Sequence, residues 1–151
     1  MKISNDPQST LVTYSLGTCI GISVYDPIVK TGGLLHFMLP DSSLDEQKSK
    51  LKPFMFADTG IPKLFKTMYQ YGAKKSRMKV FVVGGAQQNV EREMFNIGKR
   101  NILAVKKIFF KNNVITNYLH VGGTSNRTVR MNIFDGEVWI RDSIEGDINI
   151  K

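Results

Sequence analysis

The chain has 151 residues, enough to bury a core of its own, and its 42% hydrophobic and 23% charged residues are typical of a globular protein. It has no run of about 18 apolar residues and no apolar secretory segment near the N-terminus, so we expect a cytoplasmic protein without membrane insertion. A single cysteine and two histidines exclude an internal disulfide and a multi-thiolate metal centre, and we predict neither a metal nor a cofactor.

The formal net charge of +8 favours an acidic partner. Lys and Arg occur as scattered pairs, such as Lys99-Arg100 and Lys106-Lys107, rather than as one basic arm. No aromatic stripe of the kind that stacks bases is interleaved with them. A basic nucleic-acid-binding domain is therefore the least favoured class, and we predict no nucleic acid partner.

Three strands are predicted near the N-terminus. Residues 11–16 and 20–25 have the apolar and small residues of short strands, and Gly17-Thr18-Cys19 separates them. A third strand over residues 34–39 ends at Pro40, which has no N–H to donate to a sheet.

Two helices are predicted in the middle of the chain. Residues 41–58 are polar and mixed, which indicates a loop with at most a turn of helix. Pro62 fits the first position of a helix that runs to about Tyr71 and ends at Gly72, because the missing N–H is no loss there. The second helix spans roughly residues 97–111, where apolar residues recur at helical spacing.

Further strands are predicted over residues 79–83 and 114–121 and in a C-terminal hairpin. The hairpin pairs residues 128–134 with residues 137–141 across Asp135-Gly136, the strongest short hairpin signal. The total is about seven strands and two or three helices, with mixed and largely antiparallel pairing. We therefore predict an α+β fold, an α/β sandwich of sheet packed against helices, in a single domain over residues 1–151.

Cys19 lies at a turn after a strand and a glycine, where backbone N–H groups can point outward. Amide hydrolysis needs a nucleophile, a proton shuttle and donors for the developing oxyanion. A thiol with an ordinary pKa of about 8.5 is mostly protonated at neutral pH, so an imidazole must take its proton. We take His36 as that base and the backbone of Gly17, Thr18 and Cys19 as the oxyanion site. An inert, buried cysteine is the alternative.

The turn between the second and third strands decides whether His36 reaches Cys19. A turn centred on residues 26–29 places the two residues opposite each other. A turn at residues 31–33 separates them by on the order of 13 Å. The sequence permits the pair without requiring it.

His120, in an apolar strand before Gly122-Gly123, is a second candidate base, and a half-buried strand residue is its alternative role. The imidazole of a catalytic base also needs a group that orients it. Thr13, Asp26 and Asp41 are all close enough in the sequence, and the sequence does not choose among them.

The glycine pairs Gly84-Gly85 and Gly122-Gly123 each follow a predicted strand. They lack the Gly-Lys-Ser/Thr of a Walker loop and the third glycine of a dinucleotide fingerprint. We expect tight turns or close backbone approach near a site, and we take Gly84, Gly85 and Arg127 as candidate substrate-binding residues. Other polar residues near these turns, Asn96, Arg100 and Asn101, are each more typical of a helix cap or a solvated residue than of a ligand.

The ordered motifs across nearly the whole chain resemble the CheD chemoreceptor glutamine deamidase family. The stretches that carry the resemblance are residues 13–27, 32–40, 84–86, 97–102 and 122–127, and the hairpin at Asp135-Gly136. The family usually has Ser before the cysteine, where this chain has Thr18.

The resemblance implies a Cys–His–Thr catalytic set that maps to Cys19, His36 and Thr13. It implies deamidation of glutamines in the cytoplasmic domain of methyl-accepting chemotaxis receptors, without metal or cofactor, and a CheC-type phosphatase as a further partner. A non-catalytic module that docks receptors or such a phosphatase is the alternative.

Overall fold

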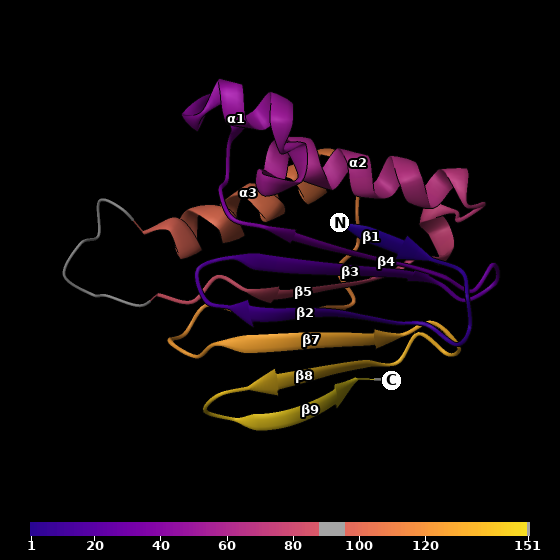
Figure 1. Ribbon diagram of the computed structural model, residues 1–151. Coiled ribbons are helices and arrows are strands. Elements are labelled where there is room, and N and C mark those ends of the chain that lie inside the picture. The colour runs from indigo at the N-terminus through magenta and orange to yellow at the C-terminus, as the bar shows by residue number, and fades with distance from the viewer. Residues whose placement is uncertain (88–95, 151) are drawn as a thin grey trace.

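The computed structural model describes residues 1–87 and 96–150, which form three layers (Figure 1). The first sheet has the strand order β1 (Lys2–Ser4), β4 (Thr31–Phe37), β3 (Ile20–Asp26), β5 (Lys79–Gly84) and β6 (Tyr118–Val121). The second has the order β2 (Thr10–Leu16), β7 (Arg127–Asn132), β8 (Val138–Asp142) and β9 (Gly146–Ile150). All pairs are antiparallel except β5 with β6, so the predicted α+β fold with mixed, largely antiparallel sheets is confirmed.

The helices α2 (Ala57–Gln70) and α3 (Ile97–Lys111) cover one face of the first sheet, and the second sheet covers the other. In the part of the chain that the structure describes, the other helical elements are a shorter helix, α1 (Glu46–Leu51), and the 3₁₀ turns η1 (Ser42–Leu44), η2 (Pro53–Met55) and η3 (Lys75–Arg77). Among the described residues, no helix has the length and apolar character needed to span a membrane.

Two hydrophobic cores lie on the two faces of β3, which is buried throughout its length. Ile20, Ile22 and Val24 face the helices, as the alternation in this strand predicts. Tyr25 faces the second sheet, where its hydroxyl donates to the carbonyl of Ile133 at 3.0 Å. Residues on this second face therefore lie between the sheets.

The turn between β3 and β4 spans residues 27–30, because Asp26 pairs with Thr31. Its shape comes from the Asp26 carboxylate, which accepts the N–H of Ile28 at 2.9 Å, and from Lys30 in the left-handed region. The predicted alternative turn at residues 31–33 is wrong: Gly32 and Gly33 lie inside β4. They are glycines because a Cβ on either would collide with side chains of the neighbouring layers.

The helix predicted from Pro62 begins five residues earlier, at Ala57, so Pro62 lies inside α2. Phe56 precedes the helix without a side-chain cap, and the Ala57 N–H donates to the Leu39 carbonyl at 2.9 Å. Tertiary contacts thus set this helix start. Its predicted end is confirmed, because Gly72 takes a positive φ of 84° after the last turn.

Several other elements differ from the predictions. The expected loop over residues 41–58 contains α1, which Asp45 caps by accepting the N–H of Lys48 at 2.9 Å. The strand predicted over residues 114–121 is confined to β6, and β1 and β9 were not predicted. Both unpredicted strands lie at sheet edges, where a strand pairs with a neighbour on one side only.

Candidate active site

The candidate site lies at one edge of the sandwich, where the β2–β3 connection and the end of β4 meet the start of α3 (left in Figure 1). The register pairs Gly21, not Cys19, with His36. Cys19 precedes Gly21 by two residues, and it packs against the core between the sheets. Cys19 lies just before the first residue of β3, two positions from the partner of His36. In a regular sheet, such diagonal neighbours have Cβ atoms about 7 Å apart, a separation that longer side chains span.

Among the described residues, no hydrogen bond joins the Cys19 thiol to His36. Contacts of catalytic groups are often long before the substrate binds, so this spacing is compatible with proton transfer in a complex.

Thr13 contacts His36 across the two sheets: its Oγ1 lies 2.8 Å from His36 Nδ1. Gly21 makes room for this contact, because a Cβ there would lie 3.4 Å from Thr13 Cγ2 and 2.8 Å from Leu16 Cδ1. A β-bulge between Thr13 and Leu16 contains Ser15 at a φ of 56°. Because of the bulge, the side chain of Leu16 is buried in the core although Thr13, three residues earlier, contacts the imidazole.

The other two candidates for orienting the imidazole lie elsewhere. Asp26 is buried at the far end of β3, where Arg77 binds it at 2.7 Å. Asp41 is exposed and caps η1 by accepting the N–H of Ser43 at 2.8 Å. Of the three, Thr13 is thus the one that contacts His36.

Burial favours the uncharged form of both reacting groups. It lowers the pKa of His36, and the N-terminal ammonium adds to that effect. Burial also raises the pKa of the Cys19 thiol, while the Cys19 N–H and the Thr18 hydroxyl act in the opposite direction. At neutral pH the resting pair is therefore a neutral thiol beside a neutral imidazole.

The loop of residues 17–19 is held in place by hydrogen bonds that its carbonyl groups accept. The Gly17 carbonyl accepts from Ala86 N at 2.8 Å and the Cys19 carbonyl accepts from Gly85 N at 2.8 Å. The Gly17 N–H donates to Ser15, so this member of the predicted oxyanion site is already engaged. Among the described residues, the N–H groups of Thr18 and Cys19 donate to no other residue's carbonyl or side chain.

The glycine pair after β5 approaches this loop closely. Gly84 has a φ of 116°, and a Cβ there would collide with the Cys19 carbonyl. The Gly122 N–H donates to the Gly84 carbonyl at 2.9 Å. The prediction of close backbone approach near a site therefore describes Gly84 and Gly85 better than a ligand role does.

Arg127 is 4% exposed and lies in the interior, not on a substrate-facing surface. Its guanidinium donates to Asp142 at 2.8 Å and to the Gly122 carbonyl at 2.8 Å. It thereby connects the second sheet to the end of β5, at the Gly84 carbonyl, and to the turn that follows β6.

The second candidate base, His120, belongs to the same network, with Nε2 3.1 Å from Asp142 Oδ2. His120, Asp142 and Glu145 place three ligand-type atoms within 4.8 Å of one another. However, Asp142 already accepts five hydrogen bonds, from the Ser125, Arg127 and His120 side chains and from two backbone N–H groups. The cluster is a saturated hydrogen-bond network, and its carboxylate has little capacity left for a ligand.

Asn101 was not predicted as part of the site, although it is fully buried on α3. Its Nδ2 donates to the carbonyls of Thr18 and Met38, both at 2.9 Å. A polar residue one turn from the buried Val105, on the apolar face of a helix, was the sequence signal for this role. The same expectation, of a helix cap, is confirmed for Asn96, which caps α3 by accepting the N–H of Lys99 at 3.0 Å.

A groove of about 350 Å³ opens beside His36 and Thr13. Thr10, Leu34 and Lys2 also line it, so it lies between the edge strands β1 and β2 of the two sheets. The imidazole is accessible from this side.

Comparisons with known proteins bear on what this site does. A family model described as "CheD chemotactic sensory transduction" matches residues 38–142. A protein of Syntrophus aciditrophicus named "Probable chemoreceptor glutamine deamidase CheD 1" is 52% identical over 142 residues, which cover 94% of this chain and 89% of the relative.

Two further relatives are named "Probable chemoreceptor glutamine deamidase CheD". The one from Solibacter usitatus is 44% identical, covering 94% of this chain and 84% of its own length. The one from Pyrococcus abyssi is 34% identical, covering 93% and 86%. The family match begins after Cys19 and His36, so the roles of individual residues depend on the geometry and not on that match.

Proposed function

The chain belongs to the CheD family, and from this premise we propose that it is a protein-glutamine deamidase acting on chemoreceptors. Cys19 is the nucleophile, His36 the base, and Thr13 the residue that orients His36. The observation that carries this assignment is the 2.8 Å contact between Thr13 and His36 on the face that also presents Cys19.

The proposed reaction begins with proton transfer from the Cys19 thiol to Nε2 of His36. In the tautomer that this step requires, Nδ1 bears the proton and donates it to Thr13 Oγ1, 2.8 Å away, which leaves Nε2 free to accept the thiol proton. The sulfur then attacks the amide carbon of a glutamine side chain, and the carbonyl oxygen becomes an oxyanion. The N–H groups of Thr18 and Cys19 are the donors for that oxyanion.

The C–N bond of the tetrahedral species then breaks. The nitrogen leaves as ammonia with the proton from His36, and a thioester remains on Cys19. Water attacks the thioester while His36 accepts one of its protons. Release of glutamate regenerates the thiol, so the cycle needs neither metal nor cofactor.

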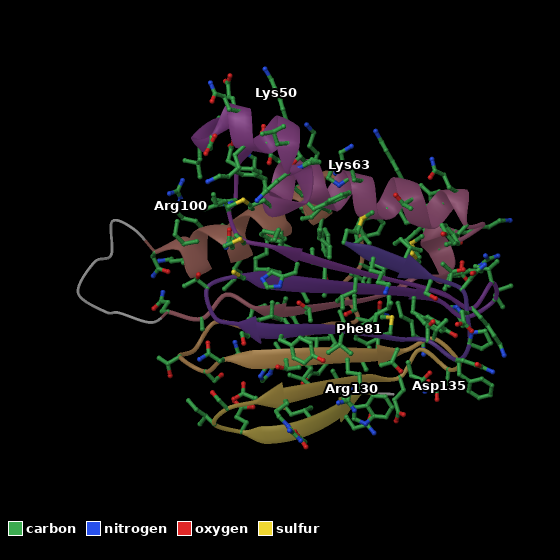
Figure 2. All side chains as sticks on the ribbon, in the orientation of Figure 1. Lys50, Lys63, Phe81, Arg100, Arg130 and Asp135 are labelled. Atoms are coloured by element: carbon green, nitrogen blue, oxygen red, sulfur yellow. The ribbon has the colours of Figure 1, made fainter. Side chains whose placement is uncertain are left out.

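The distribution of charge supports an acidic receptor surface as the substrate. Residues 41–77 and 97–111, which form the helical layer, contain 13 of the 21 Lys and Arg but 4 of the 13 Asp and Glu. Figure 2 shows Lys50, Lys63 and Arg100 projecting from this layer, away from the sheets. Charges of one sign over one layer raise the association rate of an acidic partner.

The more specific parts of the proposal rest on the family resemblance. They are a cytoplasmic location, the cytoplasmic domain of methyl-accepting receptors as the docking target, and a CheC-type phosphatase as a second partner.

The test is to incubate the chain with a receptor cytoplasmic fragment and measure glutamine-to-glutamate conversion by mass spectrometry. Wild type is expected to convert specific glutamines, and the Cys19→Ala variant is expected to convert none. If Cys19→Ala converts as much as wild type, the nucleophile is wrongly assigned. If both proteins bind the fragment and neither converts it, a non-catalytic docking module is the correct description.

A further inference from the structure

The loop that presents Cys19 has each of its three carbonyl groups tied inward. Gly17 and Cys19 accept from the backbone after β5, as described above. The Thr18 carbonyl is different, because it accepts from a side chain, Nδ2 of Asn101, at 2.9 Å. This is a connection that a single substitution can remove.

Asn101 reaches the loop because the start of α3 packs against backbone that is hydrogen-bonded to the loop. Gly98, one turn earlier, packs against the backbone of Gly85 and Ala86, and a Cβ at Gly98 would collide with both carbonyl oxygens. The Asn96 cap fixes the first turn of the helix. These contacts do not involve Asn101, and they hold the start of α3 against Gly85 and Ala86.

The same amide nitrogen donates to the Met38 carbonyl at 2.9 Å, just beyond His36 on β4. Asn101 thus ties the segment before the proposed nucleophile to the segment after the proposed base. A single amide therefore bridges the two strand ends beyond the last pair of the β3–β4 ladder, Ile20 and Phe37.

The Thr18 carbonyl and the Cys19 N–H belong to one peptide group. This group is trans, because no cis peptide bond occurs in the described chain, and in a trans peptide the C=O and N–H point in opposite directions. A carbonyl held toward α3 therefore aims the Cys19 N–H away from the helix. Cys19 itself packs against the core between the sheets, on the face opposite the helices. That N–H donates to no other residue among those described.

We propose that Asn101 is a positioning residue, which holds the Thr18 carbonyl so that the Cys19 N–H is aimed at the oxyanion of the reaction. The inference rests on the proposed function, because it presupposes Cys19 as nucleophile. It assigns Asn101 no contact with the substrate.

The cost of the arrangement supports a role beyond packing. Asn101 is fully buried and its Oδ1 has no hydrogen-bond partner among the described residues. An unpartnered buried acceptor destabilises a fold, and a leucine of similar size would avoid that penalty. The amide is thus placed for its two N–H donors.

The test compares the full-length wild type with Asn101→Leu and Asn101→Ser. Leucine removes both donors, and serine keeps one donor on a shorter side chain. Val105→Ala is the matched control, because Val105 is buried on the same face of α3 and its side chain has no N–H or O–H to donate to either carbonyl. Each protein is assayed for kcat and KM on the receptor fragment and for the rate of Cys19 alkylation by iodoacetamide.

Alkylation separates oxyanion stabilisation from a general loss of structure, because displacement of iodide forms no oxyanion. We expect Asn101→Leu to lower kcat by about 100-fold, as loss of an oxyanion donor does, with KM and alkylation changed by at most about threefold. Asn101→Ser should give a smaller loss of kcat. Val105→Ala should lower thermal stability and leave kcat near that of wild type.

If Asn101→Leu is folded and has the kcat of Val105→Ala, the inference is wrong. It is also wrong if kcat and alkylation fall together by the same factor, because Asn101 would then support the whole loop. If Asn101→Leu does not fold, the same two criteria apply to Asn101→Ser. Failure of the proposed function itself is recognised separately, by Cys19→Ala retaining activity.

Discussion

Replacing Thr13 by valine tests the hydrogen bond on which the catalytic assignment depends. Valine has the shape of threonine, so the variant removes a hydroxyl and leaves the packing against Gly21 in place. Thr13 is 8% exposed, so water does not readily replace the lost oxygen. The change is therefore confined to the partner of His36 Nδ1.

The expected loss of rate follows from the change in charge on the imidazole. A hydrogen bond between neutral groups contributes about 1 kcal/mol, whereas one to a charged group contributes roughly 1.5–3 kcal/mol. His36 becomes charged only when it takes the thiol proton, so the differential stabilisation is about 1 kcal/mol, which is roughly fivefold in rate. Loss of tautomer control adds a factor of about 2, for a total fall in kcat of roughly tenfold.

The assay is kcat for glutamine conversion in a receptor fragment, followed by mass spectrometry. Thr13→Ser keeps the hydroxyl and should retain most of the activity. Thr128→Val is the control on the adjacent strand β7, because its hydroxyl makes no hydrogen bond among the described residues. A folded Thr13→Val with a kcat within about twofold of wild type would refute the orienting role, since the bond would then contribute too little to matter.

Three further outcomes follow from the structure. Burial lowers the pKa of His36, so the acidic limb of a pH profile of kcat/KM should have its midpoint below the ordinary histidine pKa of about 6.5. A midpoint above that value would contradict a buried neutral base. The variant Arg100→Glu, on α3, should raise KM for the receptor fragment by about 3-fold to 10-fold at low salt. The control Arg130→Glu, on the second sheet (Figure 2), should leave KM unchanged. Equal effects of the two variants would exclude the helical layer as the docking face. The variant Asp142→Asn leaves the buried Arg127 cation unpaired, a loss of about 3–5 kcal/mol that should lower Tm by roughly 10 °C in a thermal melt; an unchanged Tm would show that the network is not structural.

The sequence alone determined those features that depend on local chemistry. The second long helix occupies residues 97–111 as predicted, because its apolar periodicity and the Asn96 cap are encoded within a few residues. The hairpin across Asp135-Gly136 and the helix end at Gly72 were predicted for the same reason. The motifs around Cys19 and His36 also indicated the family, which the comparisons support.

The tertiary structure decided how these pieces meet. Gly32 and Gly33 have the composition of a turn, yet they lie in a strand because neighbouring layers leave no room for a side chain. Pro62 has the signature of a helix start, yet contacts of Phe56 and Ala57 with other segments begin the helix earlier. Local preferences are worth about 1 kcal/mol each, so long-range packing overrides them.

The site shows the same division. Cys19 and His36 were recognisable as residue types, but their diagonal relation depends on the register of β3 and β4. Thr13 reaches His36 from a strand in another sheet, and Asn101 reaches Thr18 from a helix more than eighty positions along the chain. Sequence periodicity indicates which face of a helix or strand is buried. It does not indicate which residue of another layer that face contacts, because this depends on how the layers pack.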